Sequence, residues 1–289
     1  MEKLKSKVLV AVLIAMSLSS GVTHAATTGT KGENVSQKDD STITTTDLIN
    51  RLTGDGLTIT NPVYSGSNIQ VGVFDNFGFL LDPTDANDFS SGVILSTGSV
   101  EPVVATSGTN TADNQSVSIN GSSSIDPDLG AGYDHAKLTF TVVPTFDTLI
   151  LDFAFGSEEY NEYVNSGFND KLKILVGTTN CALTPDNLQF SIDTVNRAGE
   201  FTPAVGNPGP SVNPDLFINN DPGGNSGETS TATFATEMDG FTKRVTCRAS
   251  VTPNQAVDVV VGISDDGDAT LDSWAFFRAK SLRAEPGGD

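Results

Sequence analysis

The feature that most limits the fold of this chain is a repeated alternation of apolar and polar side chains. Along residues 245–251 every second side chain is apolar, and the side chains between them are polar or basic. The same period of two recurs in residues 136–143, 148–155 and 256–263. Successive side chains of a β-strand point to opposite faces, so the pattern predicts strands with one face on the core. Shorter stretches of this type predict further strands at residues 69–74, 92–97, 171–176, 188–193 and 273–281.

About ten such strands, joined by turns rich in glycine, proline and asparagine, predict an all-β chain folded as an antiparallel β-sandwich. One short N-terminal helix is expected between Thr45 and Gly54, where Leu48 and Leu52 have helical spacing. Two long loops are also expected, at residues 107–129 and 198–228. Loops of this length are usually functional or mobile.

The chain is expected to form one domain with short additions at its ends. Residues 1–25 carry lysines, an apolar run and a small-residue end, which is the pattern of a secretory signal peptide. Residues 26–43 are polar and predict a flexible leader. The β-sandwich domain is predicted over residues 44–283, with a short tail at 284–289. No later run approaches the roughly 20 apolar residues of a membrane span, so we expect an exported protein.

The charge of the chain restricts its partners. It has 36 acidic and 16 basic residues, a formal net charge of −20 at pH 7. So acidic a surface repels nucleic acids and anionic membranes, and it attracts divalent cations and cationic partners. We therefore expect neither a nucleic-acid partner nor a membrane span.

The chain has two cysteines and two histidines, and these small numbers restrict the metal sites and catalytic groups that it can form. In an exported protein Cys181 and Cys247 are expected to form a disulfide, the alternative being two buried thiols. Their spacing does not suit a zinc–thiolate site. His24 belongs to the signal peptide, which leaves His135 for any catalytic triad and excludes a multi-histidine zinc site. The chain is therefore expected not to be an enzyme.

Several segments occur in the order found in a bacterial family. They are SGVILSTG (91–98), DTLILDFAFGSEEYNEYVNSGFND (147–170), DGFTKRVTCRASVTPNQ (239–255) and VVVGISDDGDATLDSWAFF (259–277). In these segments the chain resembles the choice-of-anchor L domain. The resemblance implies an extracytoplasmic, jelly-roll-like domain of the kind found on surface proteins, and it implies little about biochemical activity. The family's members carry varied C-terminal sorting signals, whereas this chain ends in SLRAEPGGD, so we expect a free or self-associating secreted form.

Acidic residues gather in two segments that each follow a predicted strand. One surrounds Glu158, and the other begins at Asp265. Both lie past strand ends, so they can meet at one rim of a sandwich. Oxygen ligands without nitrogen or sulfur ligands favour calcium. The expected ligands are Glu158, Glu159, Asp170, Asp265, Asp268 and Asp272. The alternative is a solvated acidic face, because a chain of this charge has carboxylates throughout.

Two other functions are compatible with these residues. A lectin-like carbohydrate-binding module would stack sugars on Tyr160, Tyr163 and Trp274, although each ring can equally pack in the core. Glycoside hydrolysis would need a carboxylate pair roughly 5–10 Å apart, such as Glu158 or Glu159 with Asp268. A single tryptophan offers few of the aromatic platforms that such enzymes use.

Together these observations predict a secreted, non-enzymatic cell-surface or extracellular-matrix protein that is stabilised by calcium. It would act in adhesion, a biofilm or a filament. Its expected partners are other surface or matrix proteins, further copies of itself, and glycans. The leader at residues 26–43 could add a strand to the open sheet edge of a neighbouring copy.

Overall fold

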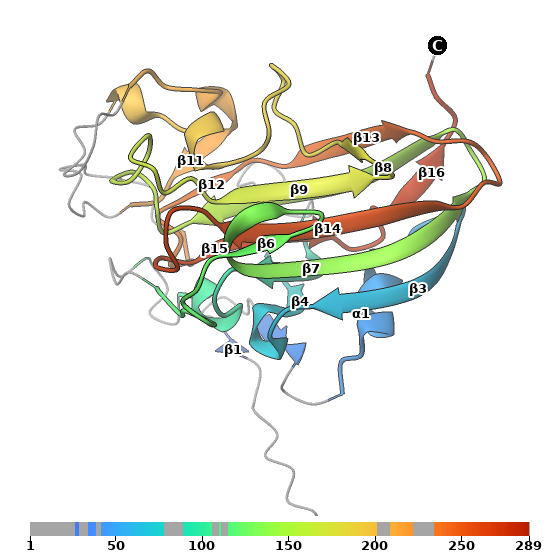
Figure 1. Ribbon diagram of the computed structural model, residues 1–289, viewed down its shortest axis with the longest axis horizontal. Coiled ribbons are helices and arrows are strands. Elements are labelled where there is room, and N and C mark those ends of the chain that lie inside the picture. The colour runs from blue at the N-terminus through green and yellow to red at the C-terminus, as the bar shows by residue number, and fades with distance from the viewer. Residues whose placement is uncertain are drawn as a thin grey trace, which may run out of the picture.

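The computed structural model describes residues 27–28, 34–38, 42–77, 89–105, 110, 115–200, 209–221 and 234–288. Over these residues the chain forms two antiparallel β-sheets that pack as two layers, which confirms the predicted all-β sandwich (Figure 1). The predicted signal peptide and parts of both long loops lie outside the described residues.

The smaller sheet has six strands, in the order β10-β9-β14-β7-β3 with β6 paired to β7. Its strands are β3 (Leu57–Ser65), β6 (Ser124–Asp126), β7 (Gly130–Pro144), β9 (Lys171–Val176), β10 (Thr179–Asn180) and β14 (Val257–Asp265). The edge strand β3 was not among the predicted strands. Pro62 lies inside it, and its pairing with β7 shifts register between Thr60 and Val63. Proline is tolerated at an edge or bulge but weakens the sequence signal of a strand.

The larger sheet has ten strands, with β1-β2-β4-β5-β15-β8-β12-β11 in order and β13 and β16 also paired to β8. Its strands are β1 (Thr27–Thr28), β2 (Asn34–Gln37), β4 (Val71–Asp75), β5 (Ser91–Ser96), β8 (Thr148–Ser157), β11 (Phe217–Asn219), β12 (Gly240–Thr242), β13 (Val245–Ser250), β15 (Ser273–Arg278) and β16 (Arg283–Glu285). The four strands that pair with β8, namely β12, β13, β15 and β16, thus all come from the C-terminal part of the chain.

The strand predicted at residues 188–193 is wrong. This segment makes only isolated bridges, Leu183 with Gln189 and Lys171 with Ser191, before a short 3₁₀ helix. The hydroxyl of Thr194 accepts a 2.9 Å hydrogen bond from the Ser191 amide, which turns the backbone out of the extended form. The 3₁₀ helices are η2 (Asn68–Gln70), η3 (Glu101–Val103), η4 (Ile192–Thr194), η5 (Ala198–Glu200) and η6 (Pro214–Leu216).

One α-helix, α1 (Thr45–Leu52), lies in the described part of the chain where a helix was predicted. Its N-cap is Thr44, one residue before the expected start of the helix. The Thr44 hydroxyl accepts a hydrogen bond from the Asp47 amide, and the Asp47 carboxylate accepts one from the Thr44 amide. Leu48, Ile49 and Leu52 are buried on the core side of the helix, as their spacing predicts.

The larger sheet buries both of its faces. On β15, Ala275 and Phe277 belong to the core between the sheets, whereas Trp274 and Phe276 belong to a second apolar cluster on the other face. Val103 and other residues of 100–105 and 234–241 contribute to this second cluster. A strand that is buried on both faces has a nearly continuous run of apolar residues in its sequence. This explains why the DSWAFF segment lacks alternation.

Cys181 and Cys247 form the predicted disulfide, with their Cα atoms 5.0 Å apart. Cys247 lies in β13 of the larger sheet, and Cys181 directly follows β10 of the smaller one. The bond therefore joins the two layers of the sandwich across the core.

Part of the predicted flexible leader is a strand of the larger sheet. β2 pairs antiparallel with β4, and Val35, fully buried, lies opposite Phe74 in the second apolar cluster. β2 thus occupies one side of β4 within its own chain. No helix in the described part of the chain has the length and apolar character needed to cross a membrane.

Removing residues 1–38 should cost about 2 kcal/mol more unfolding free energy than removing residues 1–33, because only the longer truncation uncovers the surface beneath Val35. Thermal unfolding of the two truncated proteins measures the difference. Equal midpoints would show that β2 adds nothing to the domain.

Candidate functional site

The two acidic segments predicted to converge do meet at one rim of the sandwich, where β8, β14 and β15 have their ends. β8 ends at Ser157, which lies opposite Ser273 at the start of β15. The Glu158 amide donates a 3.1 Å hydrogen bond to the Asp272 carbonyl, and the Asn169 amide donates one of the same length to the Asp266 carbonyl. Strand pairing therefore brings residues 158–170 beside residues 265–273.

A first group of carboxylates at this rim contains Asp170, Asp265 and Glu159. Asp170 has 1% of its surface exposed. Its Oδ1 accepts a 2.9 Å hydrogen bond from the Asp266 amide, and its Oδ2 accepts one of 2.7 Å from the Ser273 hydroxyl. The neighbouring Asp265 is also buried, and its Oδ1 has no hydrogen-bond partner among the described residues. Burial, followed by the negative charge of Asp170, raises the pKa of Asp265. Burial also raises the pKa of Asp170.

Glu159 adds a third buried carboxylate to this group. Its Oε2 has no hydrogen-bond partner in the described part of the chain. Burial raises the pKa of Glu159, and the charges of Asp170, Asp268 and Glu162 raise it further. Since each of these neighbours repels a negative Glu159, the group is one in which a bound cation would relieve both burial and repulsion.

A pocket of about 290 Å³ opens beside Glu159. Its walls include Glu159 and Asp268, together with the rings of Tyr163 and Phe168, whose centroids lie 5.5 Å apart in an edge-to-face arrangement. The pocket therefore combines carboxylates with aromatic surface at the rim. Ser116, Thr270 and Leu271 complete its lining.

Glu158 and Glu159 do not share one site, although they are adjacent in the chain. Burial raises the pKa of Glu158, and the next contributions come from the charges of Asp239, Glu237 and Asp272. None of the carboxylates that repel Glu159 appears in this set. The acids that most affect the two glutamates therefore differ, although Glu162 acts on both Glu159 and Asp239.

Asp272 holds a loop in place. Its Oδ1 accepts a 2.8 Å hydrogen bond from the Val117 amide, and its Oδ2 accepts one of 3.3 Å from the Ser99 amide. Burial raises its pKa to about 6. With both oxygens bound to backbone amides, Asp272 is better suited to ordering residues 115–120 than to the metal-binding role expected from the sequence.

Two of the three aromatic residues expected to bind a ligand are fully buried. The Tyr160 hydroxyl donates to the Val195 carbonyl at 2.8 Å, and the Trp274 indole donates to the Ser99 carbonyl at 2.9 Å. Stacking on a sugar does not fit this burial. Tyr163 alone of the three lines the pocket.

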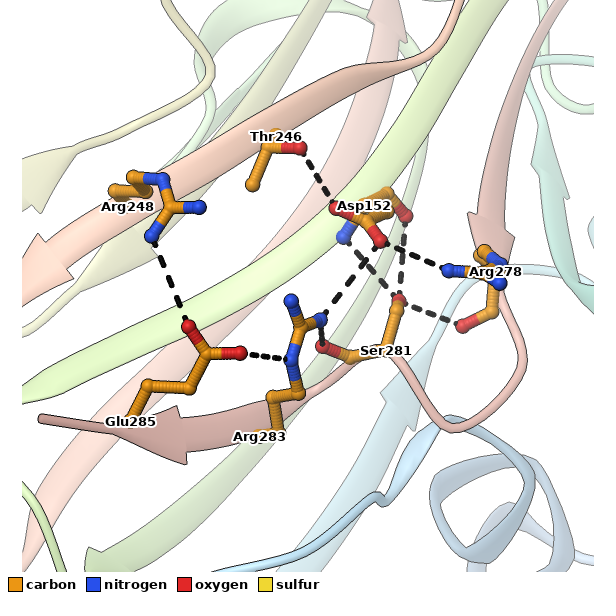
Figure 2. Close-up of polar contacts among 7 residues, drawn as sticks. All are labelled: Asp152, Thr246, Arg248, Arg278, Ser281, Arg283 and Glu285. Carbon is orange, nitrogen blue, oxygen red and sulfur yellow. Dashed lines mark hydrogen bonds and ion pairs between the residues drawn. The ribbon is translucent and has the colours of Figure 1, made fainter. Parts of the chain in front are cut away.

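Six buried acids of the rim have no lysine or arginine partner among the described residues, although Asp266 at the same rim pairs with Lys171 at 2.9 Å. Figure 2 shows the contrast: Asp152 lies near the guanidinium groups of Arg278 and Arg283, at 3.3 and 3.8 Å. Lys137 similarly pairs with Asp126 and Asp128. Among the ion pairs of the described residues, none includes Glu158, Glu159, Asp170, Asp239, Asp265 or Asp272.

The side chains of the rim are not already positioned to coordinate a metal ion. Within the described ranges, no three histidine, cysteine, aspartate or glutamate side chains are grouped so that they could hold one ion. Carboxylates that repel one another stay apart until a cation draws them together. Calcium also accepts backbone, amide and water oxygens, so the carboxylates need not supply the whole coordination shell.

Sequence reasoning missed three buried acids near Glu158. They are Asp221, Glu237 and Asp239, with 1%, 7% and 4% of their surfaces exposed. Asp221 lies in a loop rich in proline, glycine and asparagine, and the other two directly precede β12. The Asp-Gly pair at 239–240 was the available signal, because it marks a turn that places a carboxylate at a strand end.

Comparison with known proteins gives one match. The family model of the choice-of-anchor L domain matches residues 34–283. The match begins with the first residue of β2, in agreement with the place of that strand in the sheet. No curated protein and no solved structure matches the chain.

Proposed function

The chain belongs to the choice-of-anchor L domain family, and from that premise we propose that it is a non-enzymatic adhesion or matrix domain whose acidic rim is ordered by calcium. Membership implies a cell-surface or secreted protein. The disulfide between Cys181 and Cys247 is consistent with this location, since such bonds persist in oxidising surroundings.

The observation that carries the calcium proposal is the group formed by Glu159, Asp170 and Asp265. All three are buried, and neither a lysine nor an arginine among the described residues pairs with them. Burying an ionised carboxylate without a positive partner is costly. A divalent cation held by these residues and Asp268 removes that cost, and the oxygen-only donor set suits calcium.

Calcium would give the rim a mechanical role. The residues proposed to hold it come from the segment after β8 and from the end of β14 and the segment that follows it, and β8 and β14 belong to different sheets. A cation bound to both would join the two layers at the rim, as the disulfide does within the core. Such a rim suits a domain that must keep its shape outside the cell.

Thermal unfolding of the mature protein in excess EDTA, millimolar calcium or millimolar magnesium tests this proposal. A site saturated fifty-fold adds ~2 kcal/mol, which for a domain of this size raises the unfolding midpoint by roughly 5–9 °C. We expect a rise with calcium that magnesium does not reproduce. Asp170→Asn should reduce the rise. An unchanged midpoint in calcium, or an undiminished rise in the variant, would overturn the proposal.

A lectin-like function is the second candidate, and the pocket beside Glu159 favours it. Calcium bound next to Tyr163 and Phe168 could take sugar hydroxyls as ligands while the rings contact the sugar's apolar face. A glycan array with and without calcium tests this candidate. Calcium-dependent binding lost in Tyr163→Ala would support it. Turnover of a glycan that Glu159→Gln abolishes would instead show an enzyme.

A further inference from the structure

A second group of buried acids lies where β8, β12 and β11 end side by side. Strand pairing places Ser157 of β8 opposite Gly240 of β12, and Gly240 opposite Asn219 of β11. Directly opposed residues of antiparallel strands lie about 4.5–5.5 Å apart at their Cα atoms. The next residues outward along the three strands are Glu158, Asp239 and Asn220, followed by Asp221.

The carboxylates of this group act on one another through low-dielectric surroundings. Asp239 is buried, and burial raises its pKa, with further contributions from the charges of Asp221, Glu162 and Glu237. Asp239 and Glu237 in turn are the carboxylates that most strongly repel Glu158. The register of β12 on β8 places Asp239 beside Glu158, and the repulsion among these acids is consistent with one group.

Glu158 provides a second and independent sign that the group is built around a ligand. Its side chain is 2% exposed, and its Oε1 has no hydrogen-bond partner among the described residues. Buried polar atoms are rarely left without a partner, because the hydration they lose is not replaced, and the cost is greater for a charged group. No ion pair of the described residues includes Glu158 or Asp239.

Two asparagines hold the backbone around the group. The side-chain amide of Asn110 donates to Asp239 Oδ1 at 2.8 Å and to the backbone carbonyl of Asn220 at 3.2 Å. The Asn220 side-chain amide donates to the carbonyls of Thr236 and Met238, at 3.0 and 2.9 Å. Three segments of the chain, at residues 110, 220 and 236–239, are therefore joined by hydrogen bonds around Asp239.

We propose that Glu158, Asp221, Glu237 and Asp239 form a second calcium site, which ties β11 and the segment before β12 to the end of β8. Oxygen is the only donor type in the group. Calcium accepts six to eight oxygens in flexible geometry, whereas magnesium demands a near-ideal octahedron and retains its waters. The inference goes beyond the proposed function, because this site can bind calcium whether or not the Asp170 group does.

Calorimetric titration of the metal-depleted full mature chain with calcium chloride tests the proposal. We expect two equivalents of calcium for the unaltered protein and one for Asp239→Asn, with the remaining equivalent lost when Asp170→Asn is added. Asp215→Asn is the matched control, because Asp215 is an exposed acid in the same region and its replacement removes the same charge. This control should keep two equivalents.

The possible outcomes separate the two sites. Two equivalents retained in Asp239→Asn would overturn the second site. A single equivalent in the unaltered protein that only Asp170→Asn removes would overturn the second site and leave the proposed function standing. A single equivalent that only Asp239→Asn removes would support the second site and contradict the first. If Asp239→Asn does not fold by circular dichroism, Glu158→Gln, close in shape to the original residue, replaces it with the same expectations.

Discussion

Replacing Cys181 and Cys247 together by alanine should lower the midpoint of thermal unfolding by roughly 8–16 °C. The disulfide closes a loop between residues 66 apart in sequence. Without that link the unfolded chain gains conformational freedom equivalent to about 4 kcal/mol in the chain-entropy model. The link also joins the two sheets, so its removal leaves the layers held by side-chain packing and the connecting loops alone. Alanine is the suitable replacement because Cys247 lies in the apolar core.

Reduction of the unaltered protein provides the control for this prediction. A reducing agent should lower the midpoint of the unaltered protein toward that of the double variant and leave the variant unchanged. Calcium binding should survive in the variant, because neither cysteine adjoins the acidic rim in the chain. Should the double variant unfold at the same temperature as the unaltered protein, the disulfide would have no part in stability.

The strands that sequence reasoning located best are those with one solvated face. Residues 245–251 alternate clearly and correspond to β13, in which Arg248 and Ser250 are exposed, whereas in β14, predicted at residues 256–263, every residue from Val259 to Asp265 is buried. β8 was also located, although both of its faces are buried, because alternate positions hold its largest apolar side chains. The edge strand β3 was missed, and β2, which lies between β1 and β4, was assigned to a leader. Their polar composition reflects partial exposure, and only the pairing of Val35 with Phe74 reveals β2 as part of the domain.

The candidate site shows a different limit of sequence reasoning. Convergence of the acids after β8 with those after β14 followed from both lying past strand ends. The division of Glu158 and Glu159 between two groups did not follow, because it depends on which residues approach each face from elsewhere in the chain. Asp239 reaches Glu158 only through the pairing of β12 with β8, about 80 residues later in the sequence. Pairings of such high sequence separation leave little local signal in the chain.

Asp152→Ala should cost about 3 kcal/mol of unfolding free energy, the lower end of the range for breaking a buried ion pair. Asp152 is 3% exposed and accepts a 2.8 Å hydrogen bond from the Thr246 hydroxyl of β13. Its carboxylate also faces Arg278 of β15 and Arg283 of β16 (Figure 2). One carboxylate of β8 thus contacts side chains of β13, β15 and β16, three of the four strands that pair with β8. We expect a cost at the lower end of the range for a buried ion pair, because both arginines are partly exposed and can regain water when Asp152 is removed.

Asp258→Ala is the matched control for Asp152→Ala. Asp258 also lies on a strand and accepts a 2.8 Å hydrogen bond from a threonine hydroxyl, that of Thr141, but it is exposed and pairs with no arginine among the described residues. Its replacement should change the unfolding free energy by less than about 1 kcal/mol. Chemical unfolding of both variants measures the difference. Asp152→Asn should fall between them, because the amide keeps an acceptor for Thr246 while losing the charge that the arginines face. Equal losses for Asp152→Ala and Asp258→Ala would mean that the arginines gain nothing from Asp152, and that the packing of β8 alone holds the three strands together.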